Sequence, residues 1–179
     1  MSLVQKGLSY LTLLLNLSWI AGLVIYTFYR FSGNKKIENY GLKASKVLKK
    51  YYREASLLIV SAATFGSLYF SEVLGWEPCR LCWYQRTLMY PLVFVAGVAV
   101  ILEKDDVRDY ILPLTLTGSG LSLYHYVVQR IEAFQSVGCS VTQVSCETQY
   151  TYFFDYITVP MMAFTAFTTV FLLNYYFTD

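Results

Sequence analysis

The sequence predicts an all-α membrane protein with five transmembrane spans, on three observations. Hydrophobic residues make up 56% of the 179 residues and charged residues only 15%, against roughly 45–50% and about 25% in an average soluble domain. The apolar residues are gathered in five long runs whose middles contain no Asp, Glu, Lys or Arg. Each run has about the 20 residues that a helix needs to cross a hydrocarbon core, whereas barrel strands would alternate polar and apolar residues over about 10 positions.

The first run is expected to be an N-terminal anchor. It lacks a basic segment ahead of it beyond Lys6 and has no small-x-small cleavage site, so a cleaved signal peptide is the less favoured alternative. Four further runs follow, and the expected spans are Leu8–Tyr29, Ala55–Leu74, Cys82–Leu102, Tyr110–Gln129 and Tyr156–Phe177.

A basic linker, residues 33–54, separates the first two spans. Apolar residues from Ile37 to Tyr51 recur at helical spacing, and basic residues occupy another face. The pattern predicts an amphipathic helix lying on the cytoplasmic leaflet, with its basic face toward anionic headgroups. Because the only basic cluster lies between hydrophobic spans, we do not expect nucleic acid as a partner.

The distribution of Lys and Arg predicts the orientation. Ten of the fourteen Lys and Arg residues lie between the first two spans or beside the 103–109 turn, and four lie on the opposite side. Since basic residues are retained in the cytoplasm, these two connections are expected inside a multi-pass protein of the cell membrane. The N-terminus and both cysteine-bearing loops are then extracytoplasmic, and the C-terminus is cytoplasmic.

Four cysteines fall in the two outward loops. Cys79 and Cys82 form a C-x-x-C motif at the start of the third span, and Cys139 and Cys146, with six residues between them, precede the fifth. Cys82 is expected in the first helical turn, where unpaired amides and the positive end of the helix dipole stabilise a thiolate. Arg86 adds a cation one turn further on. This arrangement is suited to passing electrons to a ring dissolved in the lipid.

Three other interpretations of the cysteines compete with a redox role. Two structural disulfides are the strongest rival, because outward loops commonly carry them. A four-thiolate zinc site would need compact pairs, whereas two spans separate these pairs and the second spacing is wide. Covalent haem would require His after the motif, where this chain has Trp83. No metal is expected.

At residues 79–86, Cys-Arg-Leu-Cys-Trp-Tyr-Gln-Arg, the chain resembles the DsbB family of disulfide-generating membrane proteins, most closely its short BdbC-type members. The resemblance covers about residues 55–177 and includes Tyr124-His125-Tyr126 and Thr158-Val159-Pro160. It implies a four-helix bundle whose C-x-x-C disulfide is regenerated by a bound quinone of the ubiquinone or menaquinone type. It also implies a thioredoxin-fold partner of the DsbA type, which the second pair oxidises.

The resemblance also implies roles for individual residues. Cys82 is the quinone-facing thiol and Cys79 its partner, while Arg86 and His125 belong to the quinone site. Cys139 is the sulfur attacked by the partner's thiolate, and Cys146 passes the electrons on by exchange with Cys79. On this basis residues 55–179 form the redox bundle. The extra span, 1–32, and the linker, 33–54, have no counterpart in the four-helix core.

A thiol:quinone oxidoreductase that supports extracytoplasmic disulfide formation is therefore the favoured function. A vitamin-K-epoxide-reductase-like enzyme shares the bundle and the quinone chemistry, but it places the C-x-x-C pair after the other pair, the reverse of the order here. A non-catalytic membrane scaffold with inert disulfides is the third possibility, and it gives Arg86 no reason to lie beside Cys82.

Overall fold

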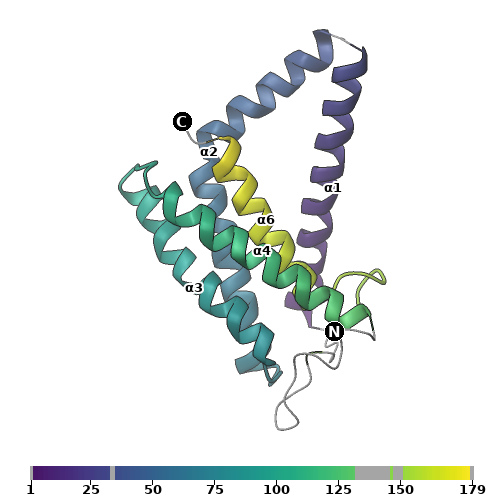
Figure 1. Ribbon diagram of the computed structural model, residues 1–179, viewed down its shortest axis with the longest axis vertical. Helices are drawn as coiled ribbons and strands as arrows, with labels where there is room; N and C mark the ends of the chain where they lie inside the picture. The colour runs from purple at the N-terminus through teal and green to yellow at the C-terminus, as the bar shows by residue number, and fades with distance from the viewer. Residues whose placement is uncertain (1, 33–34, 132–145, 147–150, 178–179) are drawn as a thin grey trace.

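The computed structural model describes residues 2–32, 35–131, 146 and 151–177. Within these ranges the regular secondary structure is helical, apart from one isolated bridge between Phe153 and Ile157. A π-helix, η1 (Tyr69–Val73), extends the second helix. The long helices are α1 (Leu3–Ser32), α2 (Lys35–Leu68), α3 (Arg80–Ile101), α4 (Arg108–Arg130) and α6 (Val159–Tyr176). The predicted helical bundle is confirmed (Figure 1).

Four of these helices, α1, α2, α3 and α6, are long and apolar enough to cross a membrane. The remaining one, α4, has 23 residues but a more polar composition. Four of its polar residues are buried in the bundle rather than turned outward, namely Thr115, Ser122, His125 and Gln129. Because these groups face protein instead of lipid, they are compatible with α4 as the fifth span.

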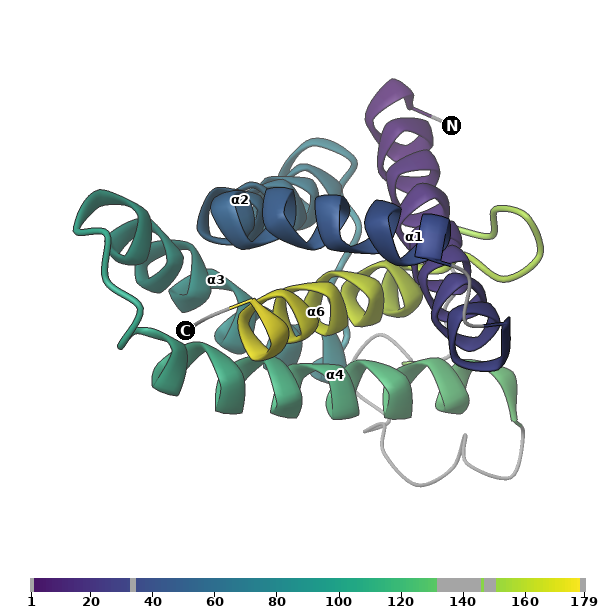
Figure 2. The same cartoon turned by 90° about the horizontal axis from the view of Figure 1, so that it is seen from above.

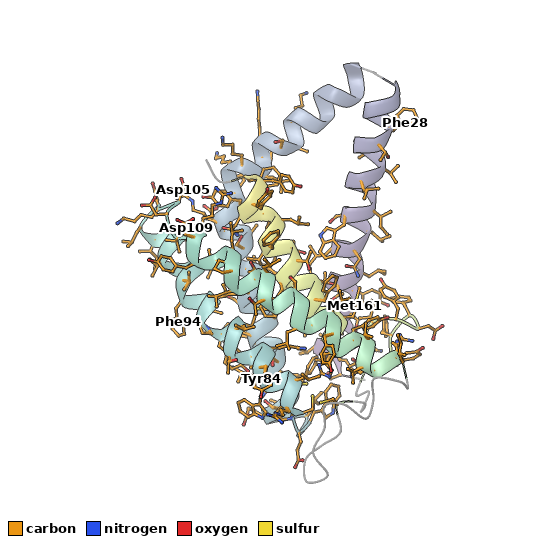
Figure 3. The ribbon with its side chains drawn as sticks, viewed as in Figure 1. Phe28, Tyr84, Phe94, Asp105, Asp109 and Met161 are labelled. Atoms are coloured by element: carbon orange, nitrogen blue, oxygen red, sulfur yellow. The ribbon has the colours of Figure 1, made fainter. Side chains whose placement is uncertain are left out.

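Large apolar side chains cover the outside of the bundle. Phe94 of α3 is 77% exposed and Phe28 of α1 is 55% exposed, and both point away from the helices in Figure 3. Asp105 and Asp109 lie together at the end where α3 passes to α4. An apolar surface this extensive is unfavourable in water, but it is the surface that surrounding lipid requires.

The two ends of the bundle are distinct. The N-terminus, the start of α3 and the end of α4 lie at one end, and the C-terminus and the turn from α3 to α4 lie at the other (Figures 1 and 2). The relative placement of the termini agrees with the orientation expected from the basic residues. Which end faces the cytoplasm stays a prediction.

Residues 35–68 form two helical segments that meet at a kink. Tyr51 has non-helical dihedrals, φ −120° and ψ 16°, and marks the kink in α2. Beyond it, the Tyr52 hydroxyl donates to a carboxylate oxygen of Asp105, and Arg53 lies 3.7 Å from the same carboxylate. These contacts fix the segment of α2 that follows the kink to the α3–α4 turn. The placement of the segment before the kink on the cytoplasmic leaflet stays a prediction.

The centre of the bundle depends on a close approach of α4 to α6. Phe167 of α6 is fully buried in a cluster with Val60, Leu92 and Ile111. A Cβ added at Gly118 of α4 would come within 2.4 Å of the Phe167 ring. A residue without a side chain therefore permits this helix contact, as small residues do at helix interfaces in membranes.

Gly118→Ala should lower the stability of the bundle, because the new methyl group overlaps the Phe167 ring. Overpacking of this kind costs about 1–3 kcal/mol, which corresponds to a fall in Tm of about 5 °C for a chain of this size. Thermal unfolding in detergent measures the change. The matched control is Gly120→Ala, which meets no atom within 4 Å and should leave Tm unchanged. An equal Tm for both variants would contradict the packing argument.

Candidate redox site

Cys79 forms the N-terminal cap of α3. Its backbone is extended, with φ −67° and ψ 171°, and its Sγ accepts a hydrogen bond from the Cys82 amide at 3.4 Å. Cys82 therefore lies in the first helical turn, as the sequence predicted. The two sulfur atoms are 3.0 Å apart, and a disulfide bond joins sulfurs at about 2.05 Å. A small side-chain movement is enough to close the pair.

The charge of the reduced pair resides mainly on Cys82. The hydrogen bond that Cys79 donates to Cys82, together with burial, raises the pKa of the Cys79 thiol from its ordinary value of 9.0 to about 12, and His125 opposes the shift only in part. Cys79 is therefore the protonated member. Cys82 lies where the first helical amides lack backbone partners and the dipole is positive, which favours a thiolate.

His125 of α4 connects the cysteines of the two loops. Its Nε2 lies 3.6 Å from Cys79 Sγ and 3.2 Å from the Cys146 carbonyl oxygen, and the side chain is 1% exposed. A carbonyl oxygen can only accept, so Nε2 carries the hydrogen. Nδ1 then accepts from the Gln85 side-chain amide at 3.0 Å. Gln85 and the carbonyl together fix the imidazole, with its N–H toward the sulfur.

The structure brings one cysteine of each predicted pair together. Cys146 is buried, and its Sγ, Cys79 Sγ and a His125 ring nitrogen all lie within 4.8 Å of one another. A zinc site was not expected because two spans separate the two cysteine pairs along the chain. The fold nevertheless brings Cys79 and Cys146 close together. The contact between Cys79 and Cys82 instead suits thiol–disulfide exchange. Cys139 lies outside the described residues.

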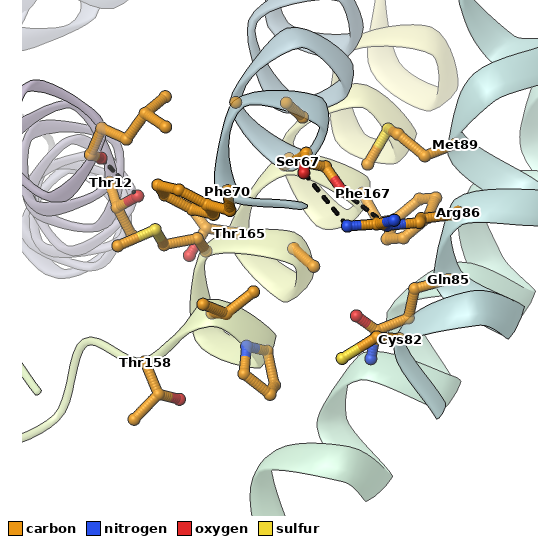
Figure 4. A pocket seen from close by; sticks show the side chains of 18 of the residues that line it. Thr12, Ser67, Phe70, Cys82, Gln85, Arg86, Met89, Thr158, Thr165 and Phe167 are labelled. Carbon is orange, nitrogen blue, oxygen red and sulfur yellow. Dashed lines mark hydrogen bonds between the residues drawn. The ribbon is translucent and has the colours of Figure 1, made fainter. Parts of the chain in front are cut away.

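Arg86 is held by α2 rather than extending freely toward Cys82. Its Nε donates to Ser67 Oγ at 2.9 Å and its Nη2 donates to the Ser67 carbonyl at 3.0 Å. The guanidinium carbon lies 5.5 Å from the Trp83 ring centroid. Ser67 stands just before η1, and π-helical segments are frequent at functional sites. The cation is thus fixed in position one helical turn further along α3 than Cys82 (Figure 4).

A largely apolar pocket opens beside this constellation. Its empty space is about 1230 Å³, part of it open to the surroundings. Cys82, Gln85 and Arg86 lie along one side, and Phe70, Phe167 and Met89 supply apolar surface in Figure 4. Cys79 and His125 also border it. Five of the six predicted site residues are therefore at or next to one pocket, and the sixth is Cys139.

Two partners of the predicted residues were missed from the sequence. Gln85 lies inside the C-x-x-C-W-Y-Q-R string, and Ser67 lies in the segment before η1, but neither type nor spacing distinguishes them from ordinary polar residues. Their importance follows from which residue they meet on another helix. The position of Gln85 next to the motif was the one available signal.

Comparison with known proteins agrees with this geometry. Residues 51–177 match the model of the family described as "Disulfide bond formation protein DsbB". The chain belongs to the DsbB family. The match contains all four cysteines, Arg86 and His125, and it spans α3, α4 and α6 completely, whereas α1 lies outside it. The resemblance inferred from the sequence is confirmed.

Several bacterial proteins of disulfide formation are similar to the chain. "Probable disulfide formation protein C 1" of Bacillus anthracis is 44% identical over 108 residues, which are 60% of this chain and 78% of that protein. "Disulfide bond formation protein C" of Bacillus subtilis is 42% identical over 113 residues, 63% of this chain and 82% of that protein. "Probable disulfide formation protein" of Oceanobacillus iheyensis is 45% identical over 135 residues, 72% and 91% respectively. No solved structure matches the chain.

In the reduced protein, Cys79 should resist alkylation until strongly alkaline pH, because its pKa is about 12. Cys82→Ala removes the largest cause of that shift, so the pH at which Cys79 begins to react should fall. Adding His125→Ala should move it upward again, since His125 lowers this pKa. Mass spectrometry of peptides alkylated across a pH series measures the reaction at Cys79 alone. An unchanged profile in Cys82→Ala would show that Cys82 does not hold the proton on Cys79.

Proposed function

We propose that this member of the DsbB family is a thiol:quinone oxidoreductase that reoxidises a thioredoxin-fold partner of the DsbA type. The observation that carries the proposal is that Cys79 and Cys146 meet at His125 while Cys82 Sγ lies 3.0 Å from Cys79 Sγ, beside an apolar pocket. One cysteine thus contacts both its own partner and the second loop. The pocket provides a place for the final electron acceptor.

The pocket fits a quinone of the ubiquinone or menaquinone type. Binding sites for such molecules are mostly apolar, with a few polar groups that fix orientation. Arg86 has five N–H groups, of which Ser67 receives two, so the guanidinium can also offer a hydrogen bond to a ring carbonyl. His125 borders the pocket as well. A bound quinone supplies the capacity to accept two electrons and two protons.

Electrons enter through the second cysteine pair. In the proposed first step, a partner thiolate attacks Cys139 of a Cys139–Cys146 disulfide, which forms a mixed disulfide and releases Cys146 as a thiolate. The partner's second thiol then resolves the mixed disulfide, and the partner leaves oxidised. Exchange of this kind runs through mixed disulfides, and its direction is set by the reduction potentials of the pairs.

Transfer between the pairs uses the contact at His125. The Cys146 thiolate attacks Cys79 of the Cys79–Cys82 disulfide, so that a Cys79–Cys146 bond forms and Cys82 leaves with the electron pair. The fixed His125 N–H lies 3.6 Å from the Cys79 sulfur and helps to hold it near Cys146 for this attack.

The Cys82 thiolate is then left at the helix N-terminus, one turn from Arg86, where its charge is stabilised. Cys139 then attacks Cys146 of the Cys79–Cys146 disulfide, so that the Cys139–Cys146 disulfide re-forms and Cys79 leaves as a thiol. The reduced Cys79–Cys82 pair borders the pocket, and a quinone held there would take up its two electrons and two protons as the Cys79–Cys82 disulfide re-forms.

Two competing functions receive less support. A scaffold with inert disulfides needs neither a buried His125 between the cysteines nor an arginine fixed by Ser67 beside the pocket. A vitamin-K-epoxide-reductase-like enzyme would carry its C-x-x-C pair after the other pair, and the match to the DsbB family runs in the order seen here. The cysteine end of the bundle is accordingly proposed to be extracytoplasmic, where a DsbA-like partner works.

The decisive assay follows quinone absorbance in detergent with a reduced thioredoxin-fold dithiol as the donor. Wild type should reduce the quinone, and Cys82→Ser should abolish the reaction. Arg86→Ala should reduce kcat/KM for the quinone by at least about tenfold, because a charged hydrogen-bond donor is worth roughly 1.5–3 kcal/mol. Arg80→Ala is the matched control, since Arg80 is exposed and donates to the Tyr84 hydroxyl instead.

Arg80→Ala should stay within about twofold of wild type, because it removes a cation that does not border the pocket. No quinone reduction by folded wild-type protein, with several quinones and several dithiol donors, would contradict the proposed function. It would leave the inert scaffold as the better account of the four cysteines.

A further inference from the structure

The pocket beside Cys82 has a wall that the family match does not include. Leu8, Leu11, Thr12 and Leu15 of α1 line the same pocket as Cys82 and Arg86, yet the match begins at residue 51. Figure 4 shows Thr12 across the pocket from Cys82, with Phe70 and Thr165 between them. The extra N-terminal helix is therefore part of the site and not only an anchor.

Two specific contacts seat α1 in this place. A Cβ added at Gly66 of α2 would come within 2.6 Å of the Leu8 side chain, so a glycine lets the two helices approach closely. On the other side, Thr165 of α6 donates to the Asn16 side-chain oxygen at 3.0 Å, and both residues are buried. Hydrogen bonds of this kind favour one rotation of a helix against its neighbour in a membrane. The same rotation turns the pocket-lining leucines inward.

The leucines of α1 divide into two faces. Leu8, Leu11 and Leu15 recur three and four residues apart, which places them on one side of a helix, and they line the pocket. Leu14 is 63% exposed and Leu17 is 52% exposed on the outside, against 38% for Leu11, which borders the open pocket. Because both sets lie on the same helix in the same bilayer, the outward pair provides an internal comparison for the inward set.

We propose that α1 forms the wall of the quinone site that contacts the isoprenoid tail, and so selects tailed quinones. This inference rests on the proposed function, because it takes the occupant to be a quinone. A ring that receives electrons from Cys82 and a hydrogen bond from Arg86 must lie at their side of the pocket. The apolar tail then extends away from them, and the leucines of α1 border that part of the space.

The test compares binding of a tailed quinone with binding of the same ring without its tail. Affinity is measured in detergent by quenching of tryptophan fluorescence, because Trp76 borders the pocket. Leu11→Ala with Leu15→Ala should weaken the tailed quinone by about tenfold, since apolar contact with the tail is lost. The affinity for the tail-less ring should stay within about twofold. Leu14→Ala with Leu17→Ala should change neither affinity.

A second variant adds volume to the pocket wall instead of removing it. Thr12→Phe fills the same region, and the Thr12 hydroxyl only donates to the Leu8 carbonyl of its own helix, so little else is lost. It too should weaken the tailed quinone and spare the tail-less ring. Thr12→Phe decides the question even where the double leucine variant does not fold.

The outcomes distinguish the role of α1 in tail binding from the proposed function itself. Wild-type affinity of the α1 variants for the tailed quinone, or an equal loss for both quinones, would overturn the role of α1. Arg86→Ala should weaken both quinones, and this result shows that the ring site exists whatever the α1 variants do. If wild type binds neither quinone, the proposed function itself fails. A loss confined to the tailed quinone in the α1 variants establishes the inference.

Discussion

The site depends on the beginning of α3 at Cys79. Because the backbone is extended at this residue and helical from the next, the Cys79 sulfur caps the helix and Cys82 falls in its first turn. The same placement brings Cys79 against His125 and close to Cys146. One helix terminus thus supplies the cap, the site for negative charge and the meeting point of the two loops. A shift of the start of α3 by one residue would separate these functions.

The membrane explains why the neighbouring polar groups are so closely paired. A polar group buried in an apolar medium is costly unless it is hydrogen-bonded, and His125 is satisfied at Nδ1 by Gln85 and at Nε2 by the Cys146 carbonyl. Arg86 is satisfied in part by Ser67. The pairings that stabilise these side chains in the bundle also orient them toward the sulfurs and the pocket. Stability and proposed chemistry therefore make the same demand on these residues.

Much of the fold, and most of the residues that gather at the candidate site, could be predicted from the sequence, because both leave one-dimensional signals. Charge-free runs mark the spans, and C-x-x-C followed by Arg86 marks the start of the helix that carries the candidate site. The exact position of the kink at Tyr51 was not predictable, since apolar residues recur at helical spacing up to this residue and the change from linker to span was expected only near residue 54. Neither were Gln85 and Ser67, or the leucines of α1 at the pocket, because their roles depend on how each helix is rotated against its neighbours. Hydrophobic runs determine where a span lies but not which of its faces meets a ligand.

The central claim is that the two cysteine pairs exchange electrons through contact between Cys79 and Cys146. It is tested most directly in the variant Cys82→Ser with Cys139→Ser, which leaves only these two thiols. Mild oxidation of the folded protein should join them, and mass spectrometry of the digested protein should find one intramolecular Cys79–Cys146 disulfide in most molecules, because their sulfurs lie within 4.8 Å. Two unreacted thiols, or disulfides only between separate chains, would contradict the account.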